Sequence, residues 1–268
     1  MKYFMGVDIG SVSTKVVLIS ANEEIKIVAS RVAPTGVRGN EVANKLIDEI
    51  LMEVNLKRDD LSLILATGYG RINVDFTDIT KTEISCHAKG AKYLFPNVHT
   101  IIDIGGQDSK AIRVGDMGEV LDFAMNDKCA AGTGRFLEVM SHALQEKLDN
   151  FGILHKEAKN MVEITSICTV FAESEVVSLL AEGKDKKDVI KGINYSVAKR
   201  ALSLMKRVGI KEEIVMTGGV AKNAGVVMAL EDLLKLKINI PEHPQIMGAL
   251  GAALFAKEMM EVKSGRDN

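Results

Sequence analysis

The sequence contains no tryptophan, and aromatic residues make up only 4% of its 268 positions. Proteins that hold single-stranded nucleic acids stack the bases on aromatic side chains, so this composition disfavours that class. The 34 basic and 36 acidic residues nearly cancel, which leaves a formal net charge of −2. Neither a basic groove for nucleic acid nor a surface for acidic membranes is therefore expected.

Long apolar segments and a disulfide framework are also missing. No uncharged apolar run approaches the ~20 residues that span a bilayer, and the N-terminus enters an expected strand without a signal-peptide segment. The three cysteines are an odd number, which argues against paired disulfides. We therefore expect a cytoplasmic protein. Its hydrophobic fraction of 47% and its length suffice for two compact lobes.

Strands and helices alternate along the chain, and their order occurs twice. The first half predicts strands at 3–8, 15–20, 25–31 and 61–66, with helices at 40–54 and 83–94. The second half predicts strands at 100–104, 110–114, 120–125, 213–217 and 237–240, with helices at 134–147, 171–181, 187–208 and 223–235. A last helix is expected at about 247–262, and the charged tail 261–268 is expected to fray.

One short pattern occurs twice, each time after an apolar strand. Residues 8–15 read Asp-Ile-Gly-Ser-Val-Ser-Thr-Lys, and residues 103–110 read Asp-Ile-Gly-Gly-Gln-Asp-Ser-Lys. Glycine turns let backbone N–H groups approach phosphate oxygens, and aspartates there can hold Mg²⁺. A single copy is more often an ordinary turn, but two copies in matching contexts favour two half-sites for a polyphosphate. The expected phosphate contacts are Gly10, Ser11, Ser13, Thr14, Lys15, Gly105 and Gly106.

Within these two loops the expected catalytic residues are Gln107, Asp103 and Asp8. Gln107 is expected to orient the water that attacks the polyphosphate, although it could instead make a plain turn hydrogen bond. Asp8 and Asp103 are the expected magnesium ligands, and Asp103 or Asp108 could act as the base. Lys15 and Lys110 are candidate point charges for phosphate, although either could lie along its strand. Neither a P-loop nor a Rossmann glycine pattern is present.

A third glycine cluster, residues 216–223, follows a strand and opens a helix. A Gly-Gly pair there admits a flat ring or a ribose against the backbone, so Gly218, Gly219 and Asn223 are expected to lie beside adenosine. The repeated order of elements describes two mixed α/β lobes, residues 1–97 and 98–246. The helix at about 247–262 is expected to complete the first lobe, and the nucleotide is expected in a cleft between the lobes.

The cysteines divide into two kinds. Cys129 and Cys168 lie in loops just before helices, whereas Cys86 lies within a helical stretch and is interpreted as a small core residue. Its neighbour His87 is interpreted as a surface or capping residue. Iron–sulfur clusters usually take four thiolates, so two cysteines supply half a ligand set and a two-fold homodimer would supply the rest. Tetrahedral zinc would fit the same four sulfurs.

The three glycine loops together resemble the actin, hexokinase and heat-shock chaperone ATPase superfamily, which implies duplicated ribonuclease H-like lobes. The motifs at 103–108, 126–136, 168–175 and 216–221 more closely resemble the activators (component A) of 2-hydroxyacyl-CoA dehydratases, within the benzoyl-CoA reductase/BadF-type ATPase family. This likeness spans nearly the whole chain. It implies one 4Fe-4S cluster per homodimer with Cys129 and Cys168 as ligands, and places Gly132, Thr133 and Gly134 near ATP or ADP.

The resemblance implies an oxygen-sensitive ATPase coupled to single-electron transfer. A ferredoxin or flavodoxin would reduce the cluster, and ATP hydrolysis would shift the helix that follows Cys129. The favoured acceptor is a 2-hydroxyacyl-CoA dehydratase, with a double-cubane protein or a benzoyl-CoA-type reductase as alternatives. A small-molecule kinase would explain the phosphate loops alone, and a nucleotide-dependent chaperone would need a client-binding module that is not evident.

Overall fold

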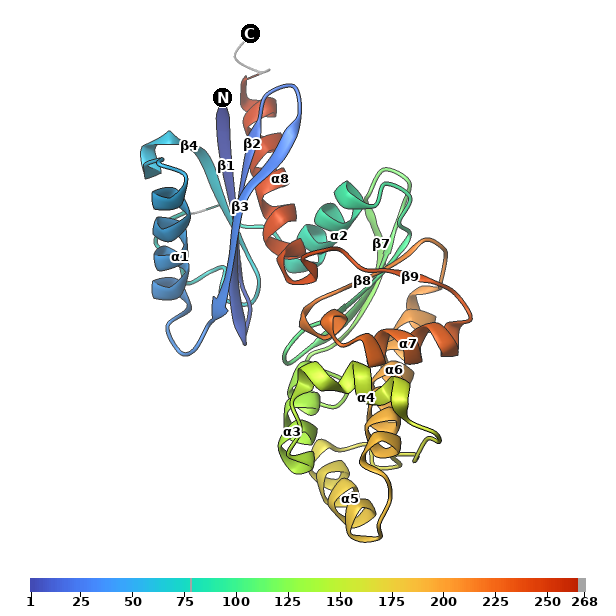
Figure 1. The fold of residues 1–268 in the computed structure, drawn as a ribbon. Coiled ribbons are helices and arrows are strands. Elements are labelled where there is room, and N and C mark those ends of the chain that lie inside the picture. The colour runs from blue at the N-terminus through green and yellow to red at the C-terminus, as the bar shows by residue number, and fades with distance from the viewer. Residues whose placement is uncertain (78, 265–268) are drawn as a thin grey trace. The chain divides into compact units, whose positions relative to one another are not determined.

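The computed structural model describes residues 1–77 and 79–264, which fall into two compact units (Figure 1). Unit 1 contains Met1–Val98, Val114–Leu121 and the C-terminal segment from Gln245. Unit 2 contains His99–Arg113 and Asp122–Pro244. The lobe boundary at 97/98 stays a prediction, and the expectation of a frayed tail at 261–268 falls partly outside the described residues.

Unit 1 is built on a four-stranded mixed sheet in the order β3-β2-β1-β4. The first strand, β1, pairs antiparallel with β2 and parallel with β4. The helices and strands of unit 1 are β1 (Lys2–Ile9), β2 (Ser13–Ala21), β3 (Ile25–Pro34), α1 (Gly39–Glu53), β4 (Leu61–Thr67), α2 (Glu83–Leu94) and α8 (Met247–Ser264).

Successive residues of β1 point to two different cores, as the two-residue period of a strand requires. Phe4 packs with α2 and α8, whereas Met5 and Val7 pack with α1. Figure 1 shows α1 on one face of this sheet and α8 on the other. α8 lies so close to its neighbours that a Cβ atom on Gly251 would overlap the backbone carbonyl of Cys86 in α2. The last helix of the chain therefore completes the layer that covers the first strands.

Unit 2 repeats the same pairing around β5, in a five-stranded sheet with the order β7-β6-β5-β8-β9. β5 pairs antiparallel with β6 and parallel with β8, as β1 does with β2 and β4. The strands of this second sheet are β5 (Thr100–Ile104), β6 (Ser109–Val114), β7 (Val120–Asn126), β8 (Ile214–Thr217) and β9 (Ile238–Asn239). Its helices are α3 (Gly134–Leu144), α4 (Phe151–Glu157), α5 (Thr169–Ala181), α6 (Lys186–Val208) and α7 (Ala224–Leu234).

Two details of the expected secondary structure were wrong. The helix predicted at 134–147 ends at Leu144, because Gln145 takes a left-handed conformation with φ of 49°. The chain then forms α4, whose seven residues are too few to show a clear helical period. None of the described helices is long and apolar enough to cross a membrane.

Two residues of α2 were assigned from the sequence, and the structure confirms the assignment of Cys86 but not that of His87. Cys86 is fully buried, as expected for a small core residue. His87 was expected at the surface, yet its side chain is only 5% exposed. The reason is the close packing of α2 against α8, which covers the helix face that carries residues 86–88, 90 and 91.

Candidate functional site

The first Asp-Ile-Gly loop joins β1 to β2. Asp8 lies directly opposite Lys15 in the antiparallel register, and the Lys15 Nζ atom is 3.3 Å from Asp8 Oδ2. The backbone N–H of Gly10 donates to the Ser13 carbonyl at 3.1 Å and closes the turn. The Asp8 side chain is 5% exposed and that of Lys15 is 15% exposed, so this ion pair is shielded from water.

Thr14 differs from the other residues predicted in this loop. It is fully buried, and its hydroxyl shares a hydrogen bond of 2.9 Å with the hydroxyl of Thr35. Thr35 in turn donates to the Gly10 carbonyl at 2.7 Å. Because adjacent strand residues point to opposite faces, the Thr14 side chain lies on the face away from Lys15. The Thr14 hydroxyl thus stabilises the loop through Thr35. Ser11, in contrast, is exposed to solvent.

The second loop, between β5 and β6, reproduces this geometry. Asp103 lies opposite Lys110, and the backbone N–H of Gly105 donates to the Asp108 carbonyl at 2.9 Å. The Lys110 Nζ atom is 2.8 Å from Asp108 Oδ2 and 3.5 Å from Asp103 Oδ2, with only 2% of the lysine side chain exposed. Gln107 is exposed in the turn. Each loop therefore presents a carboxylate neutralised by a lysine on the neighbouring strand.

A Thr-Gly pair accompanies each aspartate. Of these four residues, the sequence analysis assigned only Gly218 to the site, as an adenosine contact. Thr67 lies opposite Asp8, and Thr217 lies opposite Asp103, in the parallel register. The glycines that follow, Gly68 and Gly218, have φ of 85° and 86°. A Cβ atom on Gly218 would be 3.0 Å from Asp103 Oδ1. The matching order strand, threonine, glycine in both halves was the signal that could have revealed them.

The glycine cluster predicted to bind adenosine follows β8 directly. Gly218 is buried and Gly219 is exposed. Asn223 caps α7, because its Oδ1 atom accepts from the Gly225 N–H at 2.9 Å. Its Nδ2 atom donates to Asn194 in α6 at 3.0 Å. The loop is thus held to α6 by a side-chain amide.

Cys129 and Cys168 are both exposed, in contrast to Cys86. Cys168 precedes α5 as its N-cap residue. Arg200 of α6 holds both cysteine loops, because its guanidinium donates to the Ile167 carbonyl at 2.7 Å and its Cδ atom lies 2.6 Å from where a Cβ on Gly132 would be. Gly132 has φ of 81°, so a side chain there would be strained as well as crowded.

The segment after Cys129 is bonded to the second loop. The backbone N–H groups of Gly134 and Arg135 donate to the carbonyls of Gly105 and Gly106 at 2.9 and 2.7 Å. The Ser109 hydroxyl donates to the Gly132 carbonyl at 3.0 Å. Thr133 is fully buried, and its hydroxyl donates to the Ala130 carbonyl. The first turn of α3 is therefore hydrogen-bonded directly to the second loop.

The exposed cysteines fit an iron–sulfur cluster in their chemistry, and the loop aspartates fit Mg²⁺. Among the described residues, no group of three or more His, Cys, Asp or Glu side chains gathers around one point. One chain thus offers two exposed thiols, which is half of the set that an iron–sulfur cluster takes. Asp8 and Asp103 are hard oxygen ligands of the kind that Mg²⁺ prefers.

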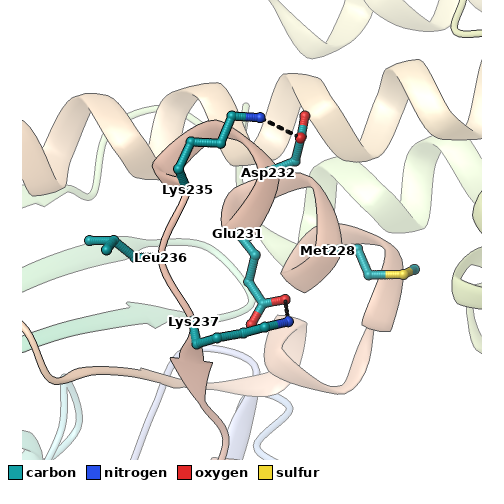
Figure 2. A pocket seen from close by; sticks show the side chains of 6 residues that line it. All are labelled: Met228, Glu231, Asp232, Lys235, Leu236 and Lys237. Atoms are coloured by element: carbon teal, nitrogen blue, oxygen red, sulfur yellow. Dashed lines mark hydrogen bonds and ion pairs between the residues drawn. The ribbon is translucent and has the colours of Figure 1, made fainter.

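A pocket at the end of α7 contains none of the predicted site residues. Figure 2 shows that its charged side chains pair with one another, Lys235 with Asp232 at 2.8 Å and Lys237 with Glu231 at 3.1 Å. Glu231 also accepts from the Ile238 N–H at 3.0 Å and so supports the edge strand β9. These interactions indicate a structural role for the residues of this pocket.

Several known proteins are similar to this chain in sequence and fold. The activator of lactoyl-CoA dehydratase from Anaerotignum propionicum is 49% identical over 97% of this chain and 100% of its own length. The solved component A of (R)-2-hydroxyglutaryl-CoA dehydratase from Acidaminococcus fermentans matches with a TM-score of 0.92 and 46% identity over 97% of this chain and 100% of that one.

A second solved structure, the activator of the 2-hydroxyisocaproyl-CoA dehydratase from Clostridium difficile with bound ADPNP, also has a TM-score of 0.92, with 43% identity over 98% of this chain and 97% of that one. The predicted fold class, α/β of the actin-like ATPase type with two mixed sheets, is confirmed. The model of the BadF/BadG/BcrA/BcrD ATPase family matches residues 5–256. The chain therefore belongs to the BadF/BadG/BcrA/BcrD ATPase family.

Proposed function

We propose that this protein is an ATP-hydrolysing iron–sulfur activator that delivers one low-potential electron to a 2-hydroxyacyl-CoA dehydratase. The observation that carries the proposal is the pair of hydrogen bonds from Gly134 and Arg135 to the carbonyls of Gly105 and Gly106. They join a phosphate loop to the segment that carries Cys129. The relatives support the same function, since they are named as activators of such dehydratases and one was solved with an ATP analogue.

On the nucleotide side, we expect each Asp-Ile-Gly loop to contribute to the binding of Mg-ATP. Asp8 and Asp103 would hold the magnesium ion, directly or through water. The backbone N–H of Gly106 would face a phosphate oxygen. Those of Gly10 and Gly105, which were expected to do the same, instead donate to the Ser13 and Asp108 carbonyls within their turns. Gln107, exposed at the turn of the second loop, would orient the attacking water.

On the redox side, Cys129 and Cys168 from each of two copies would hold one 4Fe-4S cluster. Such a cluster, when bound, accepts and releases single electrons at low potential. The surface next to Cys168 supports a second copy of the chain as the partner there. Ile167, Val170, Phe171 and Val177 are 72%, 66%, 68% and 53% exposed, which is unusual for large apolar side chains gathered on one short segment.

The chain couples the two sides through α3. A change at Gly105–Gly106 when the γ-phosphate is present or lost is passed by two backbone hydrogen bonds to the first turn of α3. Arg200 donates to the carbonyl of the residue before Cys168 and packs against Gly132, two residues before α3 begins. Both cysteine loops therefore respond to one displacement. We expect the protein to work in the cytoplasm, with a ferredoxin or flavodoxin as its donor.

The test is anaerobic purification followed by iron and sulfide analysis, EPR spectra and calorimetric titration with Mg-ADP. Cys129→Ala and Cys168→Ala should each lose the iron, while the affinity for Mg-ADP stays within about twofold of the wild type. Cys86→Ala is the matched control, because this thiol is fully buried and should leave the iron content unchanged.

The proposal is wrong if the wild-type protein is an iron-free dimer with full activity, or if Cys129→Ala keeps its iron. Phosphorylation of a small molecule by an iron-free protein would instead identify a kinase. Anaerobic assays with a 2-hydroxyacyl-CoA dehydratase, a double-cubane protein and a benzoyl-CoA-type reductase identify the acceptor. Activation of either of the last two in place of the dehydratase would contradict the partner proposed here.

A further inference from the structure

The histidine that the sequence places at the surface, His87, faces the aspartate of the first loop. Gly248 lies in the first turn of α8, and a Cβ atom there would be 2.9 Å from Asp8 Oδ2 and 3.0 Å from His87 Nε2. Both side chains thus reach the same small space, which is open only because residue 248 has no side chain. Asp8 is 4% exposed and His87 is 5% exposed, so bulk water is excluded from this contact.

The two halves of the chain differ in the hydrogen bond made by the threonine beside the aspartate. In unit 2, Asp103 has Lys110 on one oxygen and accepts from the Thr217 hydroxyl on the other at 2.8 Å. In unit 1, the equivalent Thr67 hydroxyl donates to the Lys81 carbonyl at 3.0 Å instead. Thr67, the equivalent of the threonine that orients Asp103, therefore donates its hydroxyl proton to a backbone carbonyl and not to Asp8.

We propose that His87 is a positioning residue for Asp8. Through the space above Gly248 it faces Asp8 Oδ2, the same oxygen that Lys15 approaches, whereas Thr217 binds the Asp103 oxygen that its lysine does not. A carboxylate group turns easily about its last side-chain bond, so one lysine at 3.3 Å leaves its orientation open. A donor from the opposite helix, direct or through one bridging water, removes that freedom. This inference rests on the proposed function, in which Asp8 holds the magnesium ion of the nucleotide.

Groups that orient a metal ligand typically change metal affinity by about 10- to 100-fold when removed. His87→Leu should therefore raise the dissociation constant for Mn²⁺, measured by EPR on the protein with ADP, at least about 10-fold. The affinity for ADP without metal should change less than about twofold, because the base and ribose contacts lie elsewhere. If His87 served only in packing, His87→Leu would change the affinity for Mn²⁺ and the affinity for metal-free ADP to a similar extent.

A matched pair of polar variants tests the geometry. The amide nitrogen of glutamine can reach the position of His87 Nε2, whereas that of the shorter asparagine cannot. His87→Gln should retain Mn²⁺ binding within about threefold, and His87→Asn should behave like His87→Leu. Gly248→Ala, which places a methyl group between Asp8 and His87, should also weaken Mn²⁺ binding. Its effect should not add to that of His87→Leu, because both changes remove one contact.

The inference is overturned if His87→Leu binds Mn²⁺ like the wild type, or if all three His87 variants lose metal and metal-free ADP binding equally. If a His87 variant does not fold, the Mn²⁺ affinity of Gly248→Ala is the test. A wild-type Mn²⁺ affinity for Gly248→Ala would then overturn the inference. Failure of the proposed function would look different, since the wild-type protein itself would then lack metal-dependent nucleotide binding or lack iron.

Discussion

Replacing Lys110 by methionine tests whether the buried ion pairs of the second loop stabilise the fold. The Nζ atom lies between Asp108 at 2.8 Å and Asp103 at 3.5 Å, and only 2% of the lysine side chain is exposed. Methionine fills a similar volume without the charge. Two carboxylates would then remain beside each other with no cation between them.

Removing one partner of a buried ion pair typically costs about 3–5 kcal/mol. Here the lower end applies, about 3 kcal/mol, because two features of the site reduce the cost. Asp103 keeps the Thr217 hydrogen bond at 2.8 Å, and the Asp108 side chain is 27% exposed and so partly solvated. For domains of this size that loss lowers Tm by about 6–12 °C.

Differential scanning calorimetry of the protein without nucleotide measures this loss. Lys237→Met is the control, since Lys237 is 92% exposed and its ion pair with Glu231 should contribute less than about 0.5 kcal/mol (Figure 2). Adding Mg-ADP should raise the Tm of Lys110→Met more than that of the wild type, because a metal cation would approach the same carboxylates. A Tm for Lys110→Met equal to that of the control would refute the reasoning.

Two further outcomes are expected. Gln107→Ala should lower kcat for ATP hydrolysis by about 10²–10⁴-fold while leaving Mg-ADP affinity unchanged, as measured by steady-state kinetics and calorimetry, and an equal loss of both would contradict its assigned role. Burial, with a smaller contribution from the nearby charge of Lys191, lowers the pKa of His155 from 6.5 to about 4. The unfolded chain therefore binds a proton that the folded chain does not, and the wild type loses up to about 3 kcal/mol of stability as the pH falls from 6.5 to 4. His155→Gln should show a flatter pH dependence of unfolding over that window in urea titrations, and an unchanged slope would show that His155 is not the group responsible.

The two aspartate loops could be found from the sequence because their signal is local. An apolar strand, an aspartate and a glycine turn follow one another directly, so Asp8 and Asp103 were identified without knowledge of the sheet. Lys15 and Lys110 were expected as charges for phosphate. Their ion pairs with the aspartates were not predicted, although a tight turn places each lysine opposite its aspartate on the next strand.

Other parts of the site are joined by residues distant in sequence, and these were missed. Thr217 meets Asp103 only because β8 pairs with β5, more than one hundred positions earlier in the chain. Thr14 was expected to contact phosphate, but its side chain turns to Thr35, which a hydroxyl in a strand does not reveal by itself. α4 was too short for a periodic pattern.

Short-range periodicity and turn chemistry were enough to predict two α/β lobes, the duplicated order of elements and the two kinds of cysteine. The actin-like type of the fold was implied by resemblance of the glycine loops to known ATPases. Tertiary structure alone decided which side chains meet. α8 returns from the end of the chain to cover β1 and α2, and its Gly248 opens the space in which His87 faces Asp8. Such contacts depend on how closely two backbones approach, and that distance is set by the packing of whole helices and sheets rather than by neighbouring residues.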